Sequence, residues 1–198
     1  MRTQQLPLHF KTWGGARQGA GRKPRGPKPL VSHRPRPELD ERHPLHVVLR
    51  VLPHVWSLRS GRSWPALQEA LRDGSVRAGF RLVHFSLQSN HVHLIVEADA
   101  KVALSRGMQG LAIRMARALN RLMRRRGRVF ADHYFARPLP TPTEVARAVT
   151  YVLENHRHHM PGAAGVDRFS SAADDAPRGE PRTWLLIVGW RRALRRGS

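Results

Sequence analysis

Two apolar segments that are separated by only two residues constrain the fold more than any other feature of the sequence. "FRLVHFSLQ" (80–88) and "HVHLIVEA" (91–98) are rich in β-branched, aromatic and other apolar residues, and Ser89 and Asn90 lie between them. Strand-like runs joined by a two-residue turn are typical of a β-hairpin. We therefore expect a fold built around an antiparallel sheet.

Sequence patterns predict two further strands and three helices around this hairpin. The strands are "HPLHVVLRVL" (43–52) and "RVFADHYFARPL" (128–139). Apolar residues at three- and four-residue spacing predict helices over 63–74, 102–127 and 141–160. The resulting order begins with a ferredoxin-like βαββαβ arrangement, an antiparallel sheet of the α+β class, and adds a C-terminal helix. Such a fold does not by itself specify a chemistry.

Two hydroxyl residues are candidates for the helix N-caps. Ser63 precedes Pro65 at the start of the first predicted helix, and Thr143 lies near the start of the last one. Serine and threonine favour this position because their side-chain oxygens accept hydrogen bonds from free backbone N–H groups.

The net charge indicates a polyanionic partner. The chain has 35 Lys and Arg against 14 Asp and Glu, a formal net charge of +21. Such an excess favours binding to nucleic acid or to an anionic membrane. No apolar run approaches the roughly 20 residues of a membrane helix, no secretory signal is visible, and cysteine is absent. We expect a cytoplasmic protein that binds nucleic acid and has no membrane partner.

The composition divides the chain into three parts. Residues 1–42 form a basic, Gly- and Pro-rich arm that we expect to be disordered. Residues 43–160 hold the predicted domain, and 161–198 a polar linker followed by a basic segment that docks on the domain or on DNA. Within the arm, "GRKPRGPKP" (21–29) is similar to an AT-hook, a minor-groove-binding segment, and a non-specific phosphate-binding tail explains it equally well. Its candidate DNA-binding residues are Arg22, Lys23 and Arg25.

A second set of arginines follows the helical repeat of 102–127. Arg114, Arg117, Arg121 and Arg124 recur at three- and four-residue steps, away from the apolar stripe. They form either a solvated face or a track for the DNA backbone, and the charge of the chain favours the track.

The two histidines of "HVHLIVEA" are the most informative candidate site residues. Side chains two apart in a strand project from the same face, so His91 and His93 lie together. They could bind one divalent ion or simply pack within the sheet. On the last predicted helix, Tyr151 and Asn155 are four apart and share a face, which suits a nucleophile beside a third ligand. Glu97, on the same strand face as His93, is either an extra ligand or a strand-end charge.

These motifs, in this order, resemble those of the single-tyrosine HUH transposases. "HFSLQSNHVHLIVEA", a long helix and then "YVLEN" are especially similar to REP-associated tyrosine transposases, which are bacterial relatives of insertion-sequence enzymes. The resemblance spans about 43–160 and is carried by the paired motifs. It implies that Tyr151 is the nucleophile and that His91, His93 and Asn155 bind the metal. One departure is His156, which follows Asn155 where the family has proline.

The resemblance also implies an activity and its partners. It predicts cleavage and rejoining of single-stranded or hairpin DNA through a 5′-phosphotyrosine, assisted by Mg²⁺ or Mn²⁺. The protein would then be associated with the bacterial nucleoid. Because many such transposases dimerise and REP-associated ones can act alone, both a homodimer and a monomer remain open.

Other residues and other function classes stay open at this stage. Tyr134 is an alternative nucleophile or a packed aromatic residue. Gln88 and Asn90 could orient the site, although turn chemistry explains Asn90 equally well. The histidines at the helix end are ligands, phosphate contacts or partners of the helix dipole: His156, His158 and His159.

Two non-catalytic functions compete with the transposase. One is a domesticated DNA-binding protein that has lost cleavage, which the intact His, His, Tyr and Asn set argues against. The other is an RNA-binding module, because ferredoxin-like sheets often stack single-stranded bases on exposed aromatic residues. The predicted sheet lacks an obvious aromatic pair on one face, so we rank the RNA-binding module last.

Overall fold

The computed structural model describes residues 38–159 and 165–196. The predicted AT-hook-like segment, with Arg22, Lys23 and Arg25, lies outside the described residues. None of the helices in the described ranges is both long enough and apolar enough to span a membrane.

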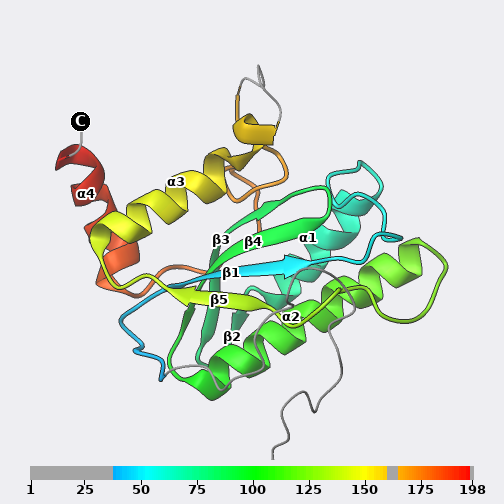
Figure 1. Cartoon of the computed structure of the whole chain (residues 1–198), viewed down its shortest axis with the longest axis horizontal. Helices are drawn as coiled ribbons and strands as arrows, with labels where there is room; N and C mark the ends of the chain where they lie inside the picture. Colours follow the sequence, from blue (N-terminus) through cyan, green and yellow to red (C-terminus); the bar gives the residue numbers. More distant parts are fainter. Residues whose placement is uncertain (1–37, 160–164, 197–198) are drawn as a thin grey trace, which may run out of the picture. The chain divides into compact units, whose positions relative to one another are not determined.

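A five-stranded antiparallel sheet forms the centre of the domain (Figure 1). Its strands, in spatial order, are β2 (Val76–Arg77), β3 (Phe80–Leu87), β4 (His91–Ala98), β1 (Leu45–Arg50) and β5 (Phe135–Pro138). The helices α1 (Ser63–Gly74) and α2 (Lys101–Leu122) connect β1 to the β2–β3 hairpin and β4 to β5. Without β2, this is the predicted ferredoxin-like βαββαβ arrangement, and the α+β fold class is confirmed.

The predicted hairpin turn is present between β3 and β4. Ser89 and Asn90 form the two-residue connection, and the backbone N–H of Gln88 donates to the carbonyl oxygen of His91 at 2.8 Å. The turn fixes the register, which pairs Leu87 with Val92 and Ser86 with His93. It thereby decides which face of the sheet receives each β4 side chain.

Each face of the sheet packs against different helices. Val92, Leu94 and Val96 of β4 face α1 and α2 and belong to the larger core, with Leu111 and Met115 of α2. Alternate residues point to the other face, which α3 (Pro142–His159) covers. There Ile95 packs against α3 in a second, smaller core. The buried residues that α3 contributes to this core are Val145, Ala148, Val149 and Val152. Figure 1 shows α2 and α3 on opposite sides of the sheet.

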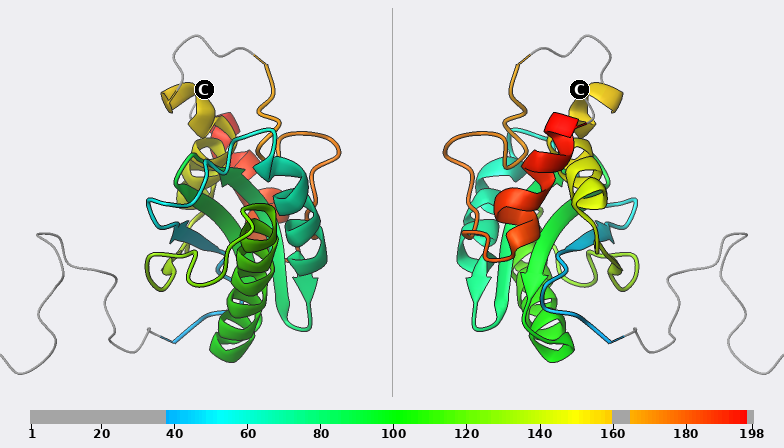
Figure 2. Two further views of the ribbon diagram at one scale, coloured as in Figure 1. Left: turned by 90° about the vertical axis from the view of Figure 1, so that its right-hand side faces the viewer. Right: turned by 90° about the vertical axis from the view of Figure 1, so that its left-hand side faces the viewer.

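The C-terminal segment packs on the same side as α3. A π-helical turn, η1 (Leu185–Gly189), leads into α4 (Trp190–Arg196), and α4 runs beside α3 (Figure 2). Leu185 and Leu186 are buried in the smaller core. The segment thus contributes apolar contacts to the helix that carries Tyr151.

Two of the predicted elements are shorter than expected. Strand β5 covers only Phe135–Pro138 of the expected 128–139, because it pairs with β1 along Leu45–Val48 and the preceding stretch makes only one isolated bridge, from Phe130 to Val51. Helix α2 ends at Leu122, since Arg124 adopts a left-handed conformation with φ 50° that a helix cannot accommodate.

The predicted caps are also displaced by a few residues. Ser63 is already helical, and Ser60 Oγ accepts the hydrogen bond from its backbone N–H at 3.0 Å. At the start of α3, Thr141 replaces Thr143: its Oγ1 accepts from the N–H of Glu144 and donates to the Glu144 carboxylate at 2.9 Å. Thr141 is therefore the side-chain N-cap of α3, and Pro142 follows in the first helical turn.

Candidate active site

The two predicted histidines lie on the sheet face that α3 covers. His91, His93 and Ile95 are two residues apart along β4 and therefore lie on the same face of the sheet. Because Ile95 packs in the core beneath α3, both imidazoles project toward this helix. His93 is buried and His91 is half-buried at the end of β4. The hairpin turn therefore places one histidine inside the fold and the other at its surface.

A continuous chain of hydrogen bonds links the histidine pair to its neighbours. His91 Nδ1 lies 2.7 Å from Asn90 Oδ1, His91 Nε2 lies 2.9 Å from His93 Nε2, and His93 Nδ1 lies 3.0 Å from His46 Nε2. Because an amide oxygen only accepts, His91 carries its proton on Nδ1 and directs the lone pair of Nε2 toward His93. Asn90 thus fixes the tautomer that a metal ligand needs.

The geometry of the pair fits a single divalent ion. Two nitrogens that bind one ion at about 2.1 Å and a right angle lie about 3 Å apart, which agrees with the 2.9 Å between the two Nε2 atoms. With the metal on Nε2, His93 would carry its proton on Nδ1 and donate it to His46. His46 suits this role because burial, and to a smaller extent Arg137, lowers its pKa and keeps the ring neutral.

Tyr151 lies against the same imidazoles. Its ring meets His93 edge-on, with centroids 5.1 Å apart and an interplanar angle of 86°, and lies 6.2 Å from the ring of His46. The residue is 40% exposed, so the phenol is accessible from solvent. Val149 and Val152, buried on the opposite flank of α3, hold the helix on the sheet and Tyr151 at this edge.

Asn155 follows one turn later and is fully buried. Within the described residues, neither side-chain atom, Oδ1 nor Nδ2, has a hydrogen-bond partner. An unpaired amide in a protein interior costs about 1–3 kcal/mol, and such exceptions are often functional. The side-chain oxygen Oδ1 of an asparagine such as Asn155 is an ordinary ligand for Mg²⁺ or Mn²⁺. The structure therefore offers a histidine pair and a buried amide on two elements that pack together.

No cluster of three or more His, Cys, Asp or Glu side chains with metal-binding geometry occurs in the described part of the chain. The candidate ligand set agrees with this finding, because it contains only two such side chains, His91 and His93, and its third member is the amide of Asn155. His46 contacts His93 on the nitrogen that faces away from His91.

Two residues that the sequence left as alternatives have structural partners. Tyr134 is partly buried against the larger core, as expected of a packed aromatic residue. The Glu97 carboxylate accepts hydrogen bonds from Arg81, from the backbone N–H groups of Arg182 and Thr183, and from Thr183 Oγ1. Glu97 thus anchors the segment that leads into η1, which is neither of the roles predicted for it.

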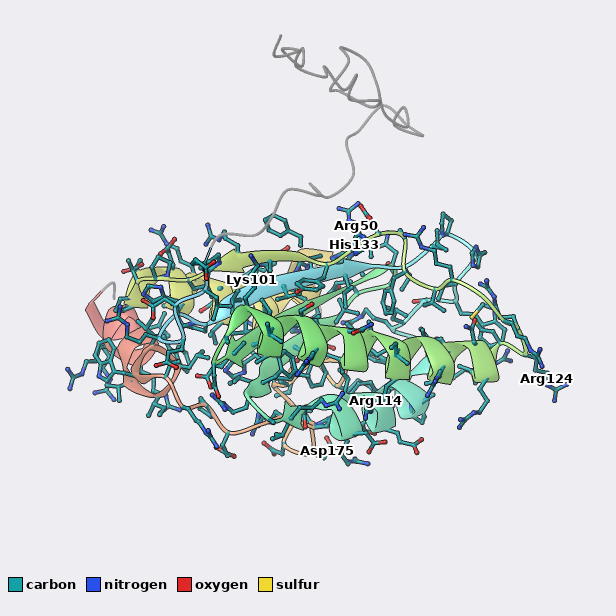
Figure 3. The ribbon with its side chains drawn as sticks, turned by 90° about the horizontal axis from the view of Figure 1, so that it is seen from below. Arg50, Lys101, Arg114, Arg124, His133 and Asp175 are labelled. Carbon is teal, nitrogen blue, oxygen red and sulfur yellow. The ribbon has the colours of Figure 1, made fainter. Side chains whose placement is uncertain are left out.

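The four arginines predicted as a track separate into different environments. Arg117 and Arg121 are exposed on α2, whereas Arg114 is half-buried and donates to the carbonyl oxygen of Gly110. Arg124 lies beyond the end of the helix (Figure 3). Arg114 also lines a pocket of about 430 Å³ together with Arg77 and Arg106.

Sequence reasoning missed two residues near the histidine pair. His46 and Arg50 lie on β1, and their alternation places them on the face opposite Leu45, Val47 and Leu49. Arg50 is directly opposite His91 in the β1–β4 pairing and is exposed. The alternation was visible in 43–52, but the register between the strands was not.

The remaining polar candidates are Gln88 and the histidines at the end of α3. Gln88 is buried and donates to Ser86 Oγ at 2.8 Å. His156 is 5% exposed and lies near Asp167, with 3.9 Å between Nδ1 and Oδ2. The side chains of His158 and His159 lie outside the part of the structure that is described.

The chain is similar to known proteins in sequence and in fold. The family profile described as "Transposase IS200 like" matches residues 43–155. Among solved structures, a REP-associated tyrosine transposase bound to a REP hairpin is similar in fold, with a TM-score of 0.54, 14% identity, and coverage of 71% of this chain and 82% of that one.

A second solved structure overlaps less. It is a protein from Deinococcus radiodurans R1 described as a transposase, at 17% identity, with a TM-score of 0.40 over 55% of this chain and 84% of that one. A TM-score this low does not by itself establish a common fold. None of the curated proteins is significantly similar to the chain.

Proposed function

Since the chain belongs to the IS200-like transposase family, we propose that it is a DNA strand transferase that cleaves and rejoins single-stranded or hairpin DNA through Tyr151. The observation that carries the proposal is the packing of an exposed tyrosine edge-on against His93, whose Nε2 lies 2.9 Å from that of His91. A nucleophile and a pair of convergent imidazoles thereby meet at one accessible edge.

The proposed first step is attack by Tyr151 on a phosphodiester. Its hydroxyl oxygen forms a bond to phosphorus, the bond from phosphorus to the 3′-oxygen breaks, and the proton of the phenol passes to solvent while the leaving oxygen gains one. The products are a 5′-phosphotyrosine and a free 3′-OH. Because the phosphodiester energy is kept in the new bond, a second 3′-OH can reverse the step and restore Tyr151 without ATP.

The neighbouring residues would prepare this step. A divalent ion, Mg²⁺ or Mn²⁺, held by His91, His93 and Asn155 would supply charge neutralisation and Lewis-acid polarisation of the scissile phosphate. Asn90 holds His91 in the tautomer that leaves its Nε2 lone pair for a ligand, and His46 fixes the ring orientation of His93. Arg50, opposite His91, adds a fixed positive charge next to the phosphate.

Binding of the flanking DNA is assigned to cationic surfaces. The exposed side chains of Arg117 and Arg121 on α2, together with Arg114 and Arg124, would contact the DNA backbone. We extend the same role to Arg22, Lys23 and Arg25 of the N-terminal arm, because extended basic segments follow phosphates without a packed core.

The test uses the polarity of the covalent link. The purified protein is incubated with Mg²⁺ or Mn²⁺ and a panel of hairpins that carry single-stranded flanks, labelled at either the 5′ or the 3′ end, and is then analysed on a denaturing protein gel. A 5′-phosphotyrosine retains the 3′-labelled fragment on the protein and releases the 5′-labelled one. We expect this asymmetric, metal-dependent labelling.

Two tyrosine variants complete the experiment. Tyr151→Phe should lose the labelled band, whereas Tyr134→Phe, the only other tyrosine of the chain, should keep it. A band that persists in Tyr151→Phe would contradict the proposal. DNA binding without any adduct across the panel would favour a non-catalytic DNA-binding protein instead.

A further inference from the structure

A pocket opens beside the histidine pair, and the chemistry above does not require it. It has a volume of about 570 Å³, within the range of small-ligand sites. Its lining residues come from the β3–β4 turn, the end of α3 and two loops: Arg59, Gln88, Ser89, Asn90, His91, His156 and Phe169. Because His91 lines both sites, a ligand in this pocket lies next to the proposed phosphate position.

His156 is the clearest sign that the pocket receives a ligand. The residue is 5% exposed, and neither ring nitrogen has a hydrogen-bond partner among the described residues. Its nearest acidic neighbour, Asp167, is 3.9 Å away, beyond hydrogen-bond distance, and Asp167 is already bound by both terminal nitrogens of Arg59 at 2.7 and 2.9 Å. A buried donor and acceptor of the described domain are thus left for a ligand in the pocket.

The charge balance of the pocket disfavours a phosphate as that group. Among the lining residues that the structure describes, Arg59 is the one charged residue apart from the histidines. It is engaged by Asp167 and by the carbonyl oxygen of Leu87 at 2.9 Å, so its charge is neutralised locally. Phosphate sites need cations or backbone N–H groups that are free to point at the anion.

The lining instead has the chemistry that recognises a nucleobase. Gln88 and Asn90 carry amides, His156 offers a ring donor and a ring acceptor, and Phe169 contributes an aromatic surface. Amide and imidazole groups read the hydrogen-bonding edge of an unpaired base, and an aromatic or apolar wall contacts its face. Gln88 is held by its hydrogen bond to Ser86, and Asn90 by its hydrogen bond to His91, so both are preorganised.

We propose that this pocket binds one unstacked base of the DNA strand that Tyr151 attacks, and that His156 is its specificity-determining residue. The inference rests on the proposed function, because the phosphate next to His91 brings the base into reach. It gives a role to His156, whose imidazole faces the pocket and is buried without a hydrogen-bond partner among the described residues.

The test compares DNA with and without bases in a protein that cannot form the covalent link. Fluorescent single-stranded octamers of dA, dC, dG and dT, and an abasic octamer with the same backbone, are titrated into Tyr151→Phe. We expect at least one base to bind about tenfold tighter than the abasic octamer, a typical magnitude for one well-contacted base. His156→Ala in the same background should bring this ratio close to one.

Controls separate the pocket from the rest of the surface. His54→Ala removes an exposed histidine outside the pocket and should leave the ratio unchanged. His156→Gln retains a donor and an acceptor and should retain part of the preference. Because the ratio is taken within one variant, a general loss of folding or of backbone binding cancels, and thermal unfolding of each variant checks the fold.

A photocrosslink locates the base directly. An octamer containing 5-iodouracil should crosslink to the peptides that hold His156 or Phe169. Two results would overturn the proposal: a ratio of one in Tyr151→Phe, or a ratio that His156→Ala does not change. If His156→Ala weakens base and abasic binding equally, the pocket is a phosphate site. The proposed strand transfer is judged by the covalent adduct, so either idea can fail alone.

Discussion

His46 Nε2 lies 3.0 Å from His93 Nδ1, on the side of that imidazole that faces away from His91. The planes of the two rings are nearly parallel, with centroids 5.2 Å apart and an interplanar angle of 19°, as expected of an in-plane hydrogen bond. His93 is therefore held from β1 while its Nε2 points toward His91. A ligand whose second nitrogen is held in this way has its ring orientation fixed before a metal binds, and a metal on Nε2 would move the proton of His93 to Nδ1, where His46 can accept it.

We predict that His46→Ala weakens metal binding without touching a proposed ligand. Loss of a partner that orients a histidine ligand typically costs about 10–100-fold in metal affinity. The affinity of the DNA-free protein for Mn²⁺, measured by electron paramagnetic resonance titration, should fall within this range.

The exposed His54 supplies the matched control. His54→Ala should bind Mn²⁺ as the parent protein does, and His46→Gln, whose amide can still accept from His93, should lie between the two. Equal Mn²⁺ affinity in His46→Ala and the parent would show that His46 only fills space.

The second prediction concerns the effect of Asn155 on the free energy of unfolding. Its amide is fully buried, and among the described residues both polar atoms are without partners. Replacing an unsatisfied buried amide with an apolar group of similar shape removes a penalty of about 1–3 kcal/mol. Asn155→Leu should therefore raise the free energy of unfolding in urea while it lowers Mn²⁺ affinity.

The comparison with Asn120 tests the reasoning. Asn120 on α2 differs in one respect: its Oδ1 is also buried without a partner among the described residues, but its Nδ2 donates to the carbonyl oxygen of Gly127 at 2.8 Å. Asn120→Leu removes that hydrogen bond and should lower stability. If Asn155→Leu destabilises the protein as Asn120→Leu does, Asn155 has a structural partner and is not reserved for a ligand.

Much of the fold was accessible from sequence because its signals are local. The two-residue turn at Ser89 and Asn90 and the period-two pattern of 91–98 fix which side of β4 each residue faces. The apolar spacing of 102–127 and 141–160 likewise identifies α2 and α3. These patterns sufficed to place His91 with His93 and Tyr151 near Asn155.

The parts that escaped prediction depend on contacts between distant segments. His46 joins the site only because of the β1–β4 register, which places it opposite Ile95. The sequence of β1 alone does not reveal this pairing. The ionic role of Glu97 needs Arg182 and Thr183, some 85 residues away along the chain. The burial of His156 likewise depends on packing that no local pattern records.

A third prediction follows from the buried Glu97 carboxylate. It pairs with Arg81 at 3.0 Å and accepts the backbone N–H groups of Arg182 and Thr183. Glu97→Gln keeps the shape but removes the charge and turns an N–H₂ group toward these donors. We expect a loss of about 3 kcal/mol in urea unfolding, at the lower end for a broken buried pair because Asp99 still contacts Arg81.

The loss should be concentrated in the C-terminal segment. Backbone amides of η1 and α4 should exchange hydrogen faster in Glu97→Gln, whereas those of β3 and β4 should change little. Glu180→Gln, an exposed carboxylate on the same loop, is the control and should leave both stability and exchange unaltered. Unchanged exchange in η1 would mean that the anchor is dispensable.

The last prediction is a loss of stability in mild acid that comes from His84. Burial, then Arg178 and Arg191, lowers the pKa of this histidine to about 4, and Nδ1 lies 3.3 Å from Ser171 Oγ. Between pH 6.5 and 4 the unfolded chain binds a proton that the folded one does not, so stability falls as pH falls through this window. From pH 7 to 4.5 the share of His84 is about 2 kcal/mol. In urea unfolding, His84→Gln should reduce the acid-induced loss by that amount, and the exposed His54→Gln should not; equal slopes would show that His84 is not buried in its neutral form.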